Sequence, residues 1–293
     1  MMDFALPLPP GYRMGDVLAF HARDAEGVAE QSSAAGFRKG VMLDGVPLVF
    51  DVAFGDASAR CTVAADGAAT ASLLESARAA LPGMLGLRID PAPFAQAVRD
   101  DPLLGPLVAR TPGLRIVQSA SVFEALSWAI IGQQINLSFA IALRRTLILQ
   151  AGRQHSSGLW CYPEAADVAA LDIEALTSRK FSRSKAETLL RLAGLVVSGT
   201  LSLARDAALD KVVEQLLAIK GIGPWTVNYA LLRGYGYADC SLQGDVAVRS
   251  ALQRLLGEDS KPTIARTEAW LAQYAPYRTM VAAYLWASLA QDD

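Results

Sequence analysis

The chain has 293 residues, of which 52% are hydrophobic and 19% charged, so it can bury a large core and is not a disordered protein. Its net charge is −2, and the acidic excess lies in residues 1–88, which hold 7 Lys/Arg and 10 Asp/Glu against 20 and 19 in the remainder. Three widely spaced cysteines and two histidines exclude a disulfide framework and a four-cysteine zinc or iron–sulfur site.

The first 88 residues combine helix and strand signals. Residues 16–31 have the apolar spacing of a helix. Three short strands are predicted over residues 36–66, because Asp/Gly turn sequences at 43–45 and 54–56 interrupt the apolar runs. A helix over 69–85 should stop at Pro82-Gly83. We therefore predict a small α+β domain with an antiparallel sheet over residues 1–88.

Helical signals dominate from residue 89 onward. The long apolar stretch 121–152 opens with Ser121, a good N-cap, and Glu124 follows at the spacing of a capping box. Further helices are predicted over 164–176, 182–198, 210–218, 224–233, 246–256, 263–273 and 277–290. Proline and glycine separate these segments, so residues 89–293 are predicted to form an all-helical domain with short connections.

The stretch "AIKGIGPWTVNYALL", residues 218–232, joins two of these helices. Gly221 and Gly223 permit a tight turn with positive φ, and Pro224 suits the first turn of the second helix. The turn leaves backbone N–H groups uncovered at a helix N-terminus, where a phosphodiester can bind with help from the Thr226 hydroxyl. On this motif alone, a plain helix–turn–helix corner is the competing interpretation.

This hairpin, with the following "DCSLQGDVAVRSAL", resembles that of the helix–hairpin–helix DNA glycosylases of base excision repair. Nearly the whole chain is similar to the bacterial DNA-3-methyladenine glycosylase II family, through "PPGYRMGDVLAFHAR", "FEALSWAIIGQQIN", "CYPEAADVAALDIEAL", "SRSKAETLLRLAGLVVSGTL" and "YAPYRTMVAAYLW". The resemblance implies an α+β N-terminal domain followed by an all-α glycosylase domain, with the hairpin at about 216–234.

The resemblance implies that Asp245 is the catalytic aspartate. The same position is an N-cap, where a helix N-terminus stabilises negative charge. Trp225 stands where the lyase members carry a lysine nucleophile, which implies a monofunctional enzyme that uses water. The implied walls of the base pocket are Trp225, Tyr229, Trp286 and Phe20, whose ring faces would receive a flipped, cationic alkylated purine. Core packing is the alternative explanation for each aromatic side chain.

The resemblance also implies a wedge and a cation site. Gln134 lies where the family inserts a side chain into the gap left by the flipped base, and Ile135 is the alternative wedge. The carbonyl groups of Leu217, Ile219 and Ile222 match those that hold a monovalent cation. A structural Na⁺ or K⁺ is therefore expected at the hairpin, and no cofactor is expected to be required.

The sequence thus predicts a monofunctional DNA glycosylase that excises alkylated bases, of the 3-methyladenine type with broad specificity, from damaged double-stranded DNA. A non-catalytic helix–hairpin–helix DNA-binding protein and a glycosylase for oxidised bases are the alternatives. Asp245 with its aromatic neighbours counts against the first, and the missing lysine against the second. A monomer is expected. A bacterial cytoplasmic location near the nucleoid is expected too, because no signal peptide and no apolar run of about 18 residues is evident.

Overall fold

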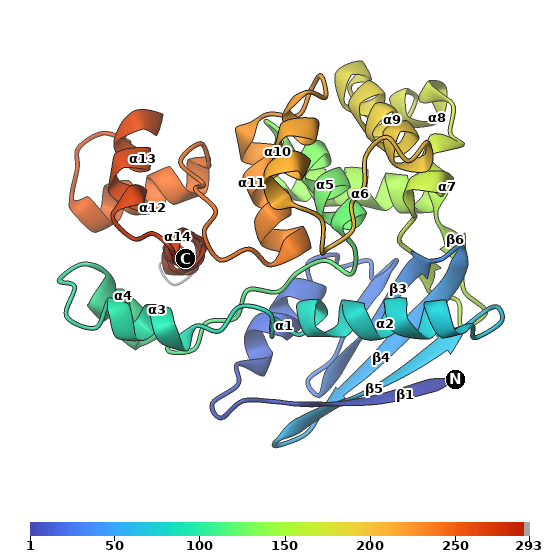
Figure 1. The fold of residues 1–293 in the computed structure, drawn as a ribbon, viewed down its shortest axis with the longest axis horizontal. Coiled ribbons are helices and arrows are strands. Elements are labelled where there is room, and N and C mark those ends of the chain that lie inside the picture. Colours follow the sequence, from blue (N-terminus) through green and yellow to red (C-terminus); the bar gives the residue numbers. More distant parts are fainter. Residues whose placement is uncertain (290–293) are drawn as a thin grey trace.

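A five-stranded antiparallel sheet forms one side of the molecule in the computed structural model, which describes residues 1–289 (Figure 1). Its strands are β1 (Met2–Pro7), β2 (Glu30–Ser32), β3 (Gly36–Leu43), β4 (Val46–Phe54) and β5 (Ser58–Ala65), in the order β1-β5-β4-β3-β2. Helices α1 (Met14–His21) and α2 (Ala71–Met84) pack against it. The predicted α+β fold of this part is confirmed.

Some of the predicted boundaries in this part are wrong. The helix expected over 16–31 ends at His21, and Glu30 begins β2, where its backbone pairs with Lys39 of β3. Strand β1 was not predicted. Helix α2 continues through Pro82 to Met84. A single proline in the last turn did not stop the helix, although it lacks an N–H for the helical ladder.

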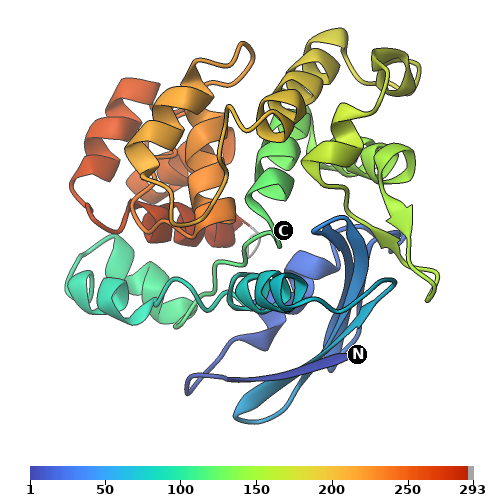
Figure 2. The ribbon, with the colours of Figure 1, turned by 45° about the vertical axis from the view of Figure 1, so that its right-hand side comes forward.

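The rest of the described chain is almost entirely helical, as predicted (Figure 2). The helices are α3 (Ala92–Ala97), α4 (Leu104–Arg110), α5 (Val122–Gly132), α6 (Leu137–Ala151), α7 (Ala165–Ala169), α8 (Ile173–Thr177), α9 (Arg183–Val197), α10 (Leu209–Leu217), α11 (Pro224–Ala230), the π-helical turn η1 (Leu231–Tyr235), α12 (Val246–Leu256), α13 (Ile264–Ala272) and α14 (Arg278–Leu289). The last residue of the helix predicted over 277–290 lies outside the described residues. Within residues 1–289, none of the helices has the length and apolar content needed to cross a membrane.

The apolar stretch 121–152 forms two helices with a loop between them. Gln134 has a positive φ of 54°, which no helix can continue, and Asn136 caps α6 by accepting the Phe139 amide at 2.8 Å. Ser121 caps α5, as predicted, by accepting the Glu124 amide at 3.0 Å. The second half of the predicted capping box is wrong, because the Glu124 carboxylate accepts the amide of Ala120 at 2.9 Å.

Residues of the helical part also extend the sheet. Strands β6 (Arg153–Gln154) and β7 (Trp160–Cys161) form a short hairpin, and Tyr162 bridges to Val41 of β3 in parallel. The two chains come so close that a Cβ on Gly40 would lie 2.2 Å from the carbonyl oxygen of Trp160. Only glycine fits at this contact, which joins the sheet to the helical part.

Candidate active site

Asp245 lies at the N-terminus of α12, as its sequence context predicted. Its Oδ1 atom accepts the backbone N–H of Val248 at 2.9 Å, so the residue is the N-cap, and its side chain is half-buried. The uncompensated N–H groups of a helix N-terminus stabilise a carboxylate. The same contact therefore marks where α12 begins and fixes the orientation of the Asp245 side chain.

Two tryptophans from other helices bind this carboxylate. Trp225 of α11 donates its indole N–H to Oδ2 at 2.9 Å, and Trp286 of α14 donates to Oδ1 at 3.1 Å. Hydrogen bonds to an ionised acceptor are about twice as strong as neutral ones. Asp245 is thus held by three N–H donors from three helices. The sequence had predicted these tryptophans as pocket walls, but nothing in it indicated that they bind the aspartate.

The four aromatic residues predicted for the base pocket lie on three helices. Trp225 and Tyr229 share one face of α11, with ring centroids 5.4 Å apart. The Tyr229 hydroxyl accepts the indole N–H of Trp128 at 2.8 Å, and Tyr229 is 9% exposed. Phe20 and Trp286 both line a cavity of about 290 Å³. The role of these rings in holding a base stays a prediction.

Two arginines that the sequence analysis missed flank Phe20. The guanidinium carbon of Arg23 lies 3.6 Å from the Phe20 ring centroid and 5.3 Å from that of Trp128. The guanidinium carbon of Arg233 lies 5.1 Å from the Phe20 centroid and 5.6 Å from that of Trp286. Burial lowers the pKa of both arginines from the ordinary value. The sequence feature that could have indicated Arg23 is its position three residues after Phe20, since residues three apart can lie on the same face of a helix.

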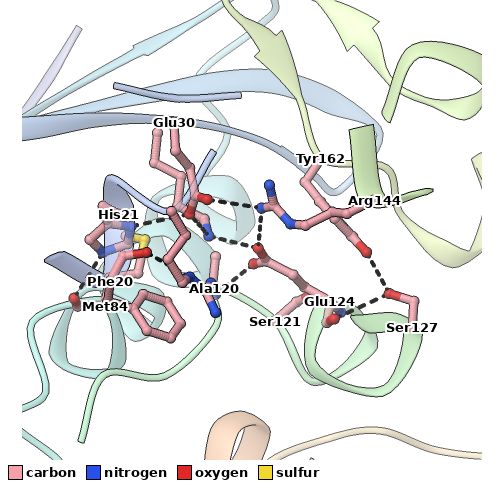
Figure 3. A network of polar contacts seen from close by, with 12 residues as sticks. Phe20, His21, Glu30, Met84, Ala120, Ser121, Glu124, Ser127, Arg144 and Tyr162 are labelled. Atoms are coloured by element: carbon pink, nitrogen blue, oxygen red, sulfur yellow. Dashed lines mark hydrogen bonds and ion pairs between the residues drawn. The ribbon is translucent and has the colours of Figure 1, made fainter. Parts of the chain in front are cut away.

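A buried ion cluster positions the segment that carries Phe20 (Figure 3). The cluster consists of Glu30, Lys39, Glu124 and Arg144, and it joins the sheet to α5 and α6. Lys39 Nζ lies 2.7 Å from a carboxylate oxygen of each glutamate, and Arg144 lies 3.1 Å from each. Burial opposes both carboxylate charges, but the two cations hold the pKa of Glu30 well below its ordinary value and lower that of Glu124.

His21, the neighbour of Phe20, binds this cluster. Its Nδ1 lies 3.1 Å from Glu30 Oε1 and its Nε2 lies 3.2 Å from the carbonyl oxygen of Met84. The imidazole stacks on Phe37 with centroids 3.9 Å apart, and burial lowers its pKa. These contacts fix the end of α1 and so determine where Phe20 lies.

The glycine hairpin has the predicted place between α10 and α11. Gly221 has a φ of 99°, and a Cβ there would lie 2.1 Å from the Thr188 hydroxyl oxygen, so only glycine fits. The prediction of a positive φ at Gly223 is wrong. Gly223 has a φ of −111°, because it is the N-cap of α11 and takes the extended conformation of that position. Open space surrounds its Cβ position, and the residue is partly exposed.

The loop after α5 is fastened to this hairpin. Gln133 donates to the carbonyl oxygen of Gly221 at 3.0 Å and to the Thr226 hydroxyl at 2.9 Å. Lys185 of α9 donates to the carbonyl oxygens of Ile131 and Gln133 at 2.6 and 2.7 Å. The Thr226 hydroxyl thus connects the hairpin to this loop. Because Thr226 is only 2% exposed, its contact with phosphate stays a prediction.

Gln134 is the residue at the tip of the loop. It is exposed, whereas Ile135 is half-buried. The sequence reasoning did not identify Gln133 and Lys185 as the residues that hold the loop. Which of Gln134 and Ile135 enters DNA stays a prediction, and the geometry favours the exposed Gln134.

Backbone carbonyl groups at the hairpin offer oxygen ligands for a cation. The Ile219 carbonyl accepts the amide of Ile222 at 3.0 Å, while those of Leu217 and Ile222 accept no hydrogen bond from the described residues. Such oxygens suit a hard cation. Among residues 1–289, no group of three or more His, Cys, Asp or Glu side chains is placed to hold a metal ion.

The fold and the site define a helix–hairpin–helix protein of DNA base excision repair. The chain belongs to the HhH-GPD superfamily of base excision DNA repair proteins, whose family model matches residues 127–276.

Comparison with known proteins agrees with this membership. A putative DNA-3-methyladenine glycosylase of Bacillus subtilis is 34% identical over 179 residues, which are 60% of this chain and 62% of that protein. The chain thus spans about six-tenths of that relative's length. The structure is similar to the 3-methyladenine DNA glycosylase of Archaeoglobus fulgidus, with a TM-score of 0.82 at 21% identity, over 97% of both chains.

A second solved structure resembles part of the chain. The 3-methyladenine DNA glycosylase of Schizosaccharomyces pombe in complex with abasic DNA matches with a TM-score of 0.57 and 26% identity. The match covers 64% of this chain and 90% of that one. These comparisons confirm the predicted fold class and the predicted family resemblance.

Proposed function

We propose that the protein is a monofunctional DNA glycosylase that excises damaged bases of the 3-methyladenine type from duplex DNA. The observation that carries this proposal is the placement of Asp245. Its carboxylate lies at the N-terminus of the helix after the hairpin and accepts the indole N–H groups of Trp225 and Trp286. The relatives' names, which include DNA-3-methyladenine glycosylases, support the same substrate class.

The proposed reaction is hydrolysis of the N-glycosidic bond. The base is flipped out of the duplex and enters the space beside the aromatic residues. As the bond between C1′ and the base nitrogen breaks, its electron pair leaves with the base, and Asp245 stabilises the positive charge that develops on the sugar. A water molecule then bonds to C1′ and releases one proton to solvent, because the cationic alkylated base becomes neutral when it takes the electron pair of the broken bond.

The local chemistry favours hydrolysis over a lyase reaction. A lyase needs an amine that attacks C1′ to form a Schiff base. The side chains that donate to Asp245 in the described chain are the indoles of Trp225 and Trp286, and the described contacts of Asp245 include no lysine. The product is therefore expected to be an intact abasic strand.

DNA would be held at the hairpin and at the loop after α5. The partly exposed Gly223 at the N-terminus of α11 has open space beside it that suits a phosphodiester, and the exposed Gln134 belongs to the loop fastened to this hairpin. The carbonyl groups of Leu217, Ile219 and Ile222 would hold Na⁺ or K⁺ beside this phosphate. We take the functional unit to be a monomer that acts on DNA in the bacterial cytoplasm.

The test is single-turnover base release from a duplex with one alkylated purine. We expect wild type to release the base without cutting the strand, and Asp245→Asn to bind the duplex but to release the base at least about 100-fold more slowly. Asp259→Asn, an exposed aspartate elsewhere, is the matched control and should behave as wild type.

Two other results would favour the alternatives. Duplex binding without base release by wild type would indicate a DNA-binding protein without catalysis. Strand cleavage without added alkali would indicate a lyase.

A further inference from the structure

Helix α9 contacts both of the segments that would meet DNA. In its first turn, Lys185 donates to the carbonyl oxygens of Ile131 and Gln133, where α5 ends and the loop begins, at 2.6 and 2.7 Å. Further along the helix, Arg191 donates to the Lys220 carbonyl oxygen of the hairpin at 3.1 Å. Helix α9 therefore connects the loop after α5 to the glycine hairpin.

The loop and the hairpin also contact each other directly. Gln133 donates to the carbonyl oxygen of Gly221 at 3.0 Å and to the Thr226 hydroxyl at 2.9 Å. The hairpin in turn lies so close to α9 that a Cβ on Gly221 would be 2.1 Å from the Thr188 hydroxyl oxygen. Loop, hairpin and α9 thus form a closed set of contacts. The loss of one contact would change the place of the loop relative to the hairpin.

Lys185 acts at the point where the chain leaves α5. The last carbonyl groups of a helix have no helical partner, and a cation beside them is stabilising. The residue that follows its second acceptor is Gln134, which is exposed and has a φ of 54°. A residue other than glycine is strained in this left-handed region and keeps it only where the surroundings hold it. The two bonds from Lys185 hold the backbone directly before this strained tip.

The Lys185 ammonium group is mostly engaged within the protein. The residue is half-buried, and two of its three N–H donors bind the carbonyl groups of the loop. A lysine that serves as a phosphate contact keeps its ammonium group in solvent, where the duplex can reach it. These contacts favour a role in holding the loop over a role as a phosphate ligand.

We infer that Lys185 is a positioning residue for base flipping, which acts through the loop and not on the DNA itself. This inference rests on the proposed glycosylase function and adds to it. A flipped base returns to the stack unless a side chain fills the gap that it leaves. With the loop held by Lys185, Gln134 is in place for this gap as soon as the duplex binds at the hairpin. Without Lys185 the duplex still binds, but the flipped state is less populated.

Substitutions of Lys185 test this role. Lys185→Met removes the ammonium group and keeps an unbranched side chain, and we expect it to slow single-turnover release of an alkylated purine at least about tenfold. The Kd for an undamaged duplex should change less than about threefold, which also shows that the variant is folded. Lys185→Arg keeps a cation with donors for both carbonyl groups and should recover part of the rate. Lys261→Met changes an exposed lysine before α13, and this matched control should behave as wild type.

Flipping is measured separately from release. The fluorescence of 2-aminopurine beside the damaged base reports unstacking, and the Asp245→Asn background prevents loss of the base during the measurement. We expect Lys185→Met to lower this signal. A damaged base opposite an abasic site has no partner to leave and costs less to flip. The rate deficit of Lys185→Met should therefore be smaller on that duplex than on a fully paired one.

Salt dependence separates positioning from a phosphate contact. A lysine that neutralises one phosphate contributes about one to the slope of log Kd against log salt concentration. We expect Lys185→Met to keep the slope of wild type, because its ammonium group binds the loop. A slope reduced by about one would overturn the inference.

The other outcomes distinguish this inference from the proposed function. Absence of base release by wild type would overturn the proposed function and the inference with it. Release by wild type together with an undiminished rate in Lys185→Met would overturn the inference alone. An equal rate deficit on the two duplexes would also overturn it, since a defect in the fold or in the chemistry slows both equally.

Discussion

Replacement of Lys39 by methionine should strongly destabilise the protein. Lys39 is fully buried and donates to Glu30 and Glu124 at 2.7 Å each. Methionine fills a similar volume but leaves two buried carboxylates facing a single cation, Arg144. Removal of one partner from a buried ion pair costs about 3–5 kcal/mol. We expect a loss of this size in the free energy of unfolding at neutral pH, measured by urea denaturation.

A second substitution should restore part of this loss. Glu124→Gln removes the charge that Lys39→Met leaves unpaired, and its amide oxygen can still accept the N–H of Ala120. The double variant should therefore be about 1–3 kcal/mol more stable than the sum of the two single effects predicts. Arg38→Met, whose partner Asp51 is 60% exposed in its side chain, is the control, with an expected change below about 1 kcal/mol.

Two results would refute this reasoning. A loss below about 1 kcal/mol for Lys39→Met would mean that water reaches the cluster and screens its charges. Strictly additive effects of Lys39→Met and Glu124→Gln would mean that the two residues do not interact in the folded protein.

Two further predictions concern pH and the hairpin. Because burial lowers the pKa of His21 in the folded state, the unfolded chain binds more protons as the pH falls through about 6.5, and stability must decrease there. The lowered pKa values of Glu30 and Glu124 add a second loss of stability below about pH 4.3. A free energy of unfolding, measured by urea denaturation, that stays constant from about pH 7.5 to 3 would contradict both expectations. Gly221→Ala should cost about 1–3 kcal/mol and weaken duplex binding, because its Cβ would meet Thr188 at a positive φ, whereas Gly223→Ala should cost below about 0.5 kcal/mol. Thermal melting and DNA titration of the two variants measure this, and equal losses would contradict the hairpin geometry.

The sequence was sufficient for features that depend on neighbouring residues. The hairpin could be predicted because glycine and proline determine backbone conformation within a few positions, and the capping place of Asp245 follows from the helix that it precedes. Gly223 shows the limit of this approach, since a glycine pattern does not say which glycine adopts a positive φ.

Contacts between residues far apart in the sequence could not be predicted from the sequence. Glu124 fits a capping box by its spacing, but it pairs with Lys39, which is 85 positions away. The indole of Trp286 reaches Asp245 across 41 positions, and Arg233 reaches Phe20 from the end of another helix. Local spacing carries no information on such pairs, because they depend on how the sheet and the helices pack. The family resemblance identified the aromatic residues but not the arginines beside them.

The pairing of Tyr162 with β3 has a consequence for protein synthesis. The Gly40 carbonyl accepts the Tyr162 amide and the Met42 amide donates to the Tyr162 carbonyl, so the sheet is completed by a residue that the ribosome adds long after the strands themselves. At about 5–20 residues per second, the roughly hundred residues between β5 and Tyr162 take about 5–20 s to synthesise. Throughout that interval residues 40–43 of β3, which β2 does not cover, form an open edge, and until residue 144 has been added Lys39 lacks part of its ion cluster. A chaperone that shields strand edges should therefore increase the yield of this protein, and a fragment that ends before Tyr162 should aggregate.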